Sequence, residues 1–181
     1  MQHPVHLRAA PLDRAIPGAI TRATAALGEN ALEPIPKSAL VLGLAGVLPF
    51  VWGGMTALSP DLARWGGGWV SPLFLGTYLI LTYGTVILSF MSGVLWGFAT
   101  RASGGEAAMG YALSVIPALW AFFMVNGDPA DAAVNLFAGF VGLLFLDWHF
   151  WKMGTAPDWW LRLRLMLTGL VLACLLVPIL T

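Results

Sequence analysis

The stretch SPLFLGTYLILTYGTVILSFMSGVLWGFATR, residues 71–101, decides the fold class, because no charged side chain interrupts it before Arg101. The preceding charge is Arg64, so residues 65–100 are uncharged throughout. A helix needs about 20 apolar residues to cross the roughly 30 Å hydrocarbon core of a bilayer. Residues 72–100 therefore predict one membrane-spanning helix, long enough to tilt or to protrude from the bilayer.

The same pattern recurs along the rest of the chain. Hydrophobic residues make up 59% of the 181 residues and charged residues 10%, against roughly 25% charged in ordinary soluble domains. Further apolar stretches predict spans over the ranges 38–58, 107–125, 130–152 and 164–180. We therefore expect an all-α membrane protein in which five transmembrane helices form one bundle, at residues 38–181. Pro49 predicts a kink in the first span, and Pro117 lies at mid-depth in the third.

Residues 1–37 are expected to form a separate cytoplasmic N-terminal tail. Within it, the apolar residues of 11–28 have the spacing of a short helix lying on the membrane surface. A tail without regular structure is the alternative.

The distribution of basic residues predicts the orientation. When the segments between the spans are assigned alternately to the two sides, only Arg64 of the nine Lys and Arg residues falls on the outer side. The others fall together on the side of the N-terminus: Arg8, Arg14, Arg22, Lys37, Arg101, Lys152, Arg162 and Arg164. Because cytoplasmic loops carry the excess of Lys and Arg, the N-terminus is expected in the cytoplasm and the C-terminus outside.

Composition and motifs exclude several function classes. The net charge is zero, whereas nucleic-acid binding needs a basic excess on one face. The single cysteine, Cys174, allows no disulfide within the chain, and three histidines supply no metal-ligand cluster. No nucleophile elbow, phosphate-binding glycine loop or paired Glu/His set is present. We expect neither enzymatic activity nor a bound metal, and the sequence specifies no cofactor.

Asp147 is the most conspicuous candidate for a functional side chain. The charge-free stretch 132–146 is short for a span, but its helical pattern continues to Lys152, which places Asp147 on the fourth span. Carboxylates inside membranes are usually paired or functional. One interpretation is an ion pair that closes the bundle, with Arg101, Arg162 or Arg164 as the partner. The other is a carboxylate that anchors a ligand or carries a proton.

Small residues at intervals of four predict close helix packing. Ser89, Gly93 and Gly97 form such a ladder in the second span, and ladders of this kind let two helix backbones approach closely in lipid. The small pairs expected to face the ladder from the fourth and first spans are Ala138 with Gly142, and Ala39 with Gly43.

Asn135 is the most polar uncharged side chain well inside a span. A hydrogen bond from Asn135 to another helix is one interpretation, since such bonds recur between membrane helices. The alternative is a ligand cavity lined by Asn135 and Asp147 together with Tyr83 and Trp96.

Four segments of the chain together resemble the DUF3429 family. They are PKSALVLGLAGVLPF (36–50), SFMSGVLWGFA (89–99), YALSVIPALWAF (111–122) and the pair LDW and PDWWLRLRLMLT (146–148 and 157–168). The resemblance covers residues 36 to about 180. It implies a small polytopic protein of the inner membrane, in a bacterium or, if the source is eukaryotic, in a mitochondrion, without an established activity.

Two functions remain open at this stage. The first is an accessory, scaffold or assembly protein that binds other membrane proteins through helix–helix contacts. The alternative is a binder or carrier of a small amphipathic ligand, such as a quinone, a tetrapyrrole or a lipid, within the bundle. Proton-coupled transport through Asp147 is a third and weaker hypothesis.

Overall fold

The computed structural model describes residues 33–181, and the part from Pro34 to Thr181 forms one compact unit. Within the described residues, all regular structure is helical. The expected surface helix at 11–28 lies outside these residues. The helices are α2 (Lys37–Ala45), α3 (Leu48–Leu58), α4 (Pro60–Gly67), the 3₁₀ turn η2 (Pro72–Phe74), α5 (Gly76–Ala99), α6 (Gly104–Ser114), α7 (Ile116–Met124), α8 (Pro129–Lys152) and α9 (Trp160–Leu180).

Five helical segments are long and apolar enough to cross a membrane, which confirms the predicted fold class. Three are single helices, namely α5, α8 and α9, and two are broken helices, α2 with α3 and α6 with α7. The last span begins at Trp160 and is continuous. Arg162 and Arg164 therefore both lie on the spanning helix itself.

Proline produces both breaks. Pro49 and Pro117 each occupy the second position of the helix that follows the break, where the missing amide is tolerated. At the second break, a freed amide finds its partner on a neighbouring span. The Ser92 hydroxyl of α5 accepts a hydrogen bond of 2.8 Å from the Ala118 amide, in the first turn of α7. A similar bond joins α3 to the start of α5, where the Thr56 hydroxyl accepts a hydrogen bond of 2.8 Å from the amide of Gly76.

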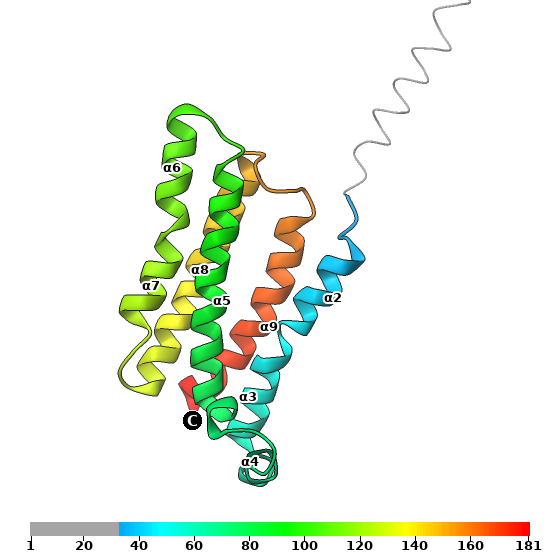
Figure 1. The fold of residues 1–181 in the computed structure, drawn as a ribbon, viewed down its shortest axis with the longest axis vertical. Helices are drawn as coiled ribbons and strands as arrows, with labels where there is room; N and C mark the ends of the chain where they lie inside the picture. Colours follow the sequence, from blue (N-terminus) through cyan, green and yellow to red (C-terminus); the bar gives the residue numbers. More distant parts are fainter. Residues whose placement is uncertain (1–32) are drawn as a thin grey trace, which may run out of the picture. The chain divides into compact units, whose positions relative to one another are not determined.

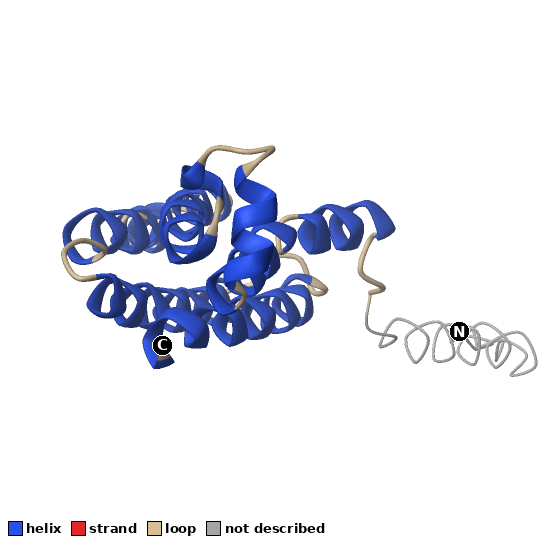
Figure 2. Ribbon diagram, turned by 90° about the horizontal axis from the view of Figure 1, so that it is seen from below, coloured by secondary structure: helices blue, strands red, loops and turns tan. Residues whose placement is uncertain are grey.

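Helix α5 occupies the centre of the bundle and packs against α3, α6, α7 and α8, while α8 packs most extensively against α9. Figure 1 shows α5 in front, with α6 and α7 on one side and α9 and α3 on the other. Helix α4 lies across one end of the bundle, as the views in Figure 1 and Figure 2 agree. The ends of α5 and α8 and the beginning of α9 come together at the opposite end, where Asp147 is found.

Two glycines bring α5 and α8 into close contact. A Cβ added to Gly84 of α5 would lie 2.5 Å from Leu136 Cδ2, and one added to Gly139 of α8 would lie 2.6 Å from Leu88 Cδ2. Each helix thus offers one glycine that accommodates a leucine of the other. Because the hydrophobic effect does not drive helices together in lipid, such close van der Waals contact is what holds them.

The predicted small-residue ladder is not part of this packing. Gly93 and Gly97 are exposed, and a Cβ on either would have no described atom within 4 Å. Ala138 and Gly142 of α8 are exposed as well. The inward face of α5 carries the larger side chains Leu88, Met91 and Leu95 instead, so the ladder lies on the opposite side of the helix. The prediction of close packing within the chain is wrong for Gly93, Gly97, Ala138 and Gly142, whereas Ser89 is half-buried.

The other proposed pair is also corrected. Gly43 of α2 packs against α9, where Leu167 Cδ1 would lie 2.7 Å from an added Cβ, and not against the ladder of α5. Gly43 is a close-contact residue with a different partner from the one expected.

Replacing Gly84 by Leu is expected to destabilise the bundle by about 1–3 kcal/mol, because the new side chain overlaps Leu136 and forces the helices apart. The matched substitution Gly93→Leu, on the same helix, is expected to leave stability unchanged within about 0.5 kcal/mol. Thermal unfolding of both variants in the same detergent micelles provides the measurement. Equal midpoints for the two variants would contradict the packing described above.

Candidate functional site

Asp147 is completely buried and both of its carboxylate oxygens are bound. Arg164 Nε of α9 donates to Oδ2 at 2.7 Å, and Trp160 Nε1 donates to Oδ1 at 2.8 Å. Arg164 is itself only 5% exposed. The structure therefore contains a buried ion pair between α8 and α9, supported by one indole, and it selects Arg164 from the three arginines considered from sequence.

Helix geometry explains why Arg164 is the partner. Trp160 and Arg164 are four residues apart on α9, so both project from one face of the helix toward α8. Arg162 is two residues from Arg164, which puts it on another face, where it is half-buried. Arg101 has a different function in the fold, since its Nη1 donates to the Thr155 carbonyl at 3.0 Å. It ties the end of α5 to the connection between α8 and α9.

The connection between α8 and α9 determines how the start of α9 is placed against the end of α8. Gly154 ends α8 with a φ of +70°, a conformation that residues with a side chain rarely adopt. The Thr155 amide and hydroxyl both donate to the Phe150 carbonyl, at 3.2 and 3.0 Å. This tight turn brings the beginning of α9 back alongside Asp147.

Two buried polar atoms next to the ion pair are unsatisfied. Arg164 Nη2 and Thr168 Oγ1 are buried without a hydrogen-bond partner among the described residues. Thr168 is 1% exposed and lies one helical turn beyond Arg164 on the same face. Other helical threonines bond the carbonyl one turn back, as Thr85 does with Leu81 at 2.8 Å. Since buried polar groups are normally paired, two unsatisfied groups side by side are notable.

Both atoms belong to residues that line a cavity of about 170 Å³ between the first span, α5, α8 and α9. The other residues that line the cavity are apolar, and they include Phe50, Phe90 and Phe140. The broken first span contributes Gly43, Gly46 and Val47, so the break at Pro49 helps to form the cavity. Leu42 and Phe90 are 72% and 64% exposed, which means that the cavity reaches the outer surface of the bundle.

The structure does not form the ligand cavity that was considered as the alternative for Asn135, with Asp147, Tyr83 and Trp96 as its lining. Trp96 is half-exposed and its ring lies 4.7 Å from that of Tyr111. Asn135 Nδ2 donates to the Met124 carbonyl at 2.9 Å and so joins α8 to the end of α7, as the first interpretation of Asn135 expected. Tyr83 packs edge-on against Phe50 and its hydroxyl approaches Gly46, behind the wall of the observed cavity.

Sequence reasoning missed Trp160 and Thr168. The available signal was the spacing of 160, 164 and 168, which places all three on one face of α9. This shared face would have been visible from sequence if the last span had been extended back to Trp160. In the described part of the chain, no three His, Cys, Asp or Glu side chains are close enough to hold a metal ion.

The fold and the site define a polytopic membrane protein with a charged cluster inside its helix bundle. The comparison with known families is consistent with this class. Residues 35–180 match the family described as protein of unknown function (DUF3429), and the chain belongs to that family. Transmembrane protein 69 of Xenopus tropicalis is 34% identical over 143 residues, covering 77% of this chain and 52% of that protein. The chain thus spans about half the length of this relative, and no solved structure matches it.

Asp147→Asn is expected to destabilise the protein by roughly 3–5 kcal/mol, because it leaves the Arg164 charge buried without a counter-ion. Arg164→Gln should have a similar effect, and the double variant should recover part of the loss because neither charge remains. Unfolding midpoints of the three variants in detergent test this expectation. Asp158→Asn, which alters an exposed carboxylate at the same end, is the control. Additive effects of the two single substitutions would contradict a coupled pair.

Proposed function

We propose that this protein binds a small amphipathic ligand inside the membrane, in the cavity beside Arg164 and Thr168. The observation that carries the proposal is the pair of buried hydrogen-bonding atoms, Arg164 Nη2 and Thr168 Oγ1, at the edge of an otherwise apolar cavity. The two atoms supply only the lower limit of the about two to four polar partners of a buried water, and the other walls are apolar. A ligand with one polar end and an apolar body fits these walls better.

The charges around the cavity favour a neutral ligand. Asp147 and Arg164 compensate each other, so an anionic ligand would add a charge that nothing nearby balances. Such a charge is costly in the interior of a membrane bundle. A carbonyl oxygen can accept hydrogen bonds from both the guanidinium and the hydroxyl without carrying a charge.

The size of the cavity limits the ligand further. An engineered apolar cavity of about 150 Å³ is known to hold one benzene ring, and the cavity here measures about 170 Å³. A single ring bearing a carbonyl, as in a quinone, is compatible with this volume, whereas the four linked rings of a tetrapyrrole are not. The exposed Leu42 and Phe90 offer a path along which an apolar tail would pass into the bilayer. Of the candidates named from sequence, a quinone is therefore the best supported.

Thr168→Val provides a specific test, because the hydroxyl that it removes has no partner among the described residues. The variant without ligand is expected to be as stable as the original protein or more stable. Its affinity for a short-chain quinone is expected to fall roughly three- to tenfold, the equivalent of one hydrogen bond. The measurement is a titration of the purified protein with decylubiquinone, followed by the quenching of tryptophan fluorescence.

Thr85→Val is the matched control, since Thr85 lies on α5 and its hydroxyl is bonded to Leu81. It should leave quinone affinity unchanged. Absence of saturable quinone binding to the original protein would overturn the proposal, as would unchanged affinity in Thr168→Val.

A second candidate function is the binding of other membrane proteins as a non-enzymatic accessory or assembly component. The observation that favours it is the outward position of Gly93 and Gly97, which form a small-residue surface on α5 that no described part of the chain covers. Small residues at this spacing are typical of helix–helix interfaces in membranes. The two functions are compatible, because the α5 surface and the cavity use different residues.

Gly93→Leu is expected to remove a specific cross-linked complex from native membranes, since the larger side chain prevents close approach of a partner helix. Gly142→Leu, at an exposed glycine of α8, is the control and should retain the complex. Cross-linking in membranes followed by mass spectrometry identifies the partner. A complex that persists in Gly93→Leu would exclude this surface as the interface.

The proposed orientation places the end of the bundle with the Asp147 site on the cytoplasmic side of an inner membrane. Among residues 34–181, four basic residues occupy the loops and helix ends at this end: Lys37, Arg101, Lys152 and Arg162. The opposite end carries Arg64 with three acidic residues, Asp61, Asp128 and Asp131. This asymmetry supports a cytoplasmic location for the basic end.

A further inference from the structure

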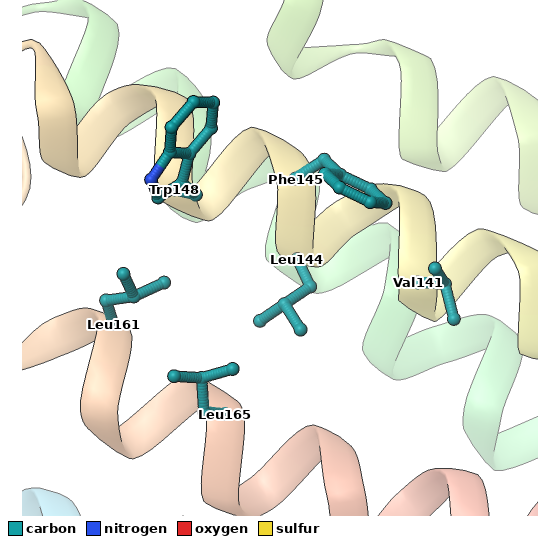
Figure 3. Close-up of a pocket in the computed structure, with 6 residues that line it drawn as sticks. All are labelled: Val141, Leu144, Phe145, Trp148, Leu161 and Leu165. Carbon is teal, nitrogen blue, oxygen red and sulfur yellow. The ribbon is translucent and has the colours of Figure 1, made fainter.

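A second, larger hollow lies on the outside of the bundle, between α8 and α9 (Figure 3). Its volume is about 430 Å³. Figure 3 shows Leu144 of α8 pointing toward Leu161 and Leu165 of α9, with Trp148 and Leu161 toward one end of the hollow and Val141 at the other. The lining side chains are Val141, Leu144, Phe145 and Trp148 of α8, with Leu161 and Leu165 of α9. We refer to this feature as the α8–α9 groove.

A positive charge stands at one end of the groove. Lys152 Nζ lies 5.3 Å from the centre of the Trp148 ring, over its face. The intervals between Val141, Phe145, Trp148 and Lys152 are four, three and four residues, so all four lie along one side of α8. The groove therefore runs from the ammonium group of Lys152 toward the middle of α8.

The length of this row matches one leaflet of a bilayer. Lys152 follows Val141 by eleven positions along the helix, which corresponds to about 16 Å. Half of the hydrocarbon core is about 15 Å thick. With Lys152 at the headgroups, the groove extends to the membrane midplane, and a single acyl chain has the length to occupy it.

The surrounding charges favour an anionic headgroup. Within residues 34–181, the loops and helix ends at this end carry four basic residues and two acidic ones, Glu106 and Asp158. Arg164 and Asp147 do not change this balance, because they neutralise each other. Basic residues at the membrane surface attract anionic lipids by about 1 kcal/mol for each Lys or Arg.

From these observations we infer that the α8–α9 groove is a binding site for an anionic phospholipid. One acyl chain lies along Phe145 and Leu165, and the phosphate of the headgroup pairs with Lys152. Trp148 sits between the two parts, where the amphipathic indole contacts both chain and headgroup region. The site shares no residue with the cavity beside Arg164, so it does not depend on the proposed quinone binding.

The test compares two phospholipids with the same acyl chains. The full-length protein in micelles is titrated with dioleoylphosphatidylglycerol or with dioleoylphosphatidylcholine, and bound lipids are counted by native mass spectrometry. The original protein is expected to retain the first lipid several-fold better than the second. Lys152→Gln should lower the affinity for phosphatidylglycerol about fivefold, the factor that corresponds to one cation at the surface. Lys152→Arg should restore it.

Two further variants keep the inference falsifiable. Lys37→Gln removes the same charge from the start of α2, at the same end but outside the groove, and should leave the preference unchanged. Leu144→Trp fills the groove and should reduce retention of both lipids. Equal retention of the two lipids by the original protein would overturn the inference. An equal loss of phosphatidylglycerol affinity in Lys37→Gln and Lys152→Gln would also overturn the inference. Such a result would mean that anionic lipids respond to the overall surface charge and not to a specific site in the groove.

Discussion

The ion pair between Asp147 and Arg164 is the interaction on which the Asp147 end of the bundle depends. A carboxylate can remain charged inside an apolar bundle only when hydrogen bonds and a counter-ion replace water. Asp147 obtains both from α9 alone, through Arg164 and Trp160. This requirement fixes the rotation of α9 about its own axis. The same rotation turns Thr168, which lies on the face of Trp160 and Arg164, toward the interior of the bundle. The same rotation leaves Leu161 and Leu165 on the outside, where they form one wall of the α8–α9 groove.

Elsewhere the bundle is held by close packing, and glycine determines where that packing occurs. Gly84 and Gly139 each accommodate a leucine of the facing helix, and this sets the separation of α5 and α8. Gly93, Gly97 and Gly142 contribute nothing to these contacts. A residue without a side chain is useful only where another helix approaches it, so the outward glycines leave a surface that a partner helix could approach equally closely.

The proline breaks connect the local sequence with the cavity. In a straight first span, α2 would continue the line of α3, and Gly43, Gly46 and Val47 would lie differently against α9. The break before Pro49 instead brings these residues to the wall beside Arg164 and Thr168. Backbone groups released by such a break must be bonded within the protein, because the bilayer core offers no water. Ser92 and Thr56 supply comparable bonds at the second break and at the start of α5.

The sequence by itself determined the membrane class, the five spans, the kink at Pro49 and the location of Asp147 on a helix. Each follows from local properties, since the length of an apolar run and the position of a proline do not depend on neighbouring helices. The tertiary structure decided which face of each helix points inward. The packed face of α5 includes Gly84 and Leu88, and the ladder consists of Ser89, Gly93 and Gly97. Both sets repeat every four residues, so spacing alone does not show which of them faces inward. The choice of Arg164 as the partner of Asp147, and the cavity next to it, result from the relative rotation of α8 and α9, which only the packed bundle fixes.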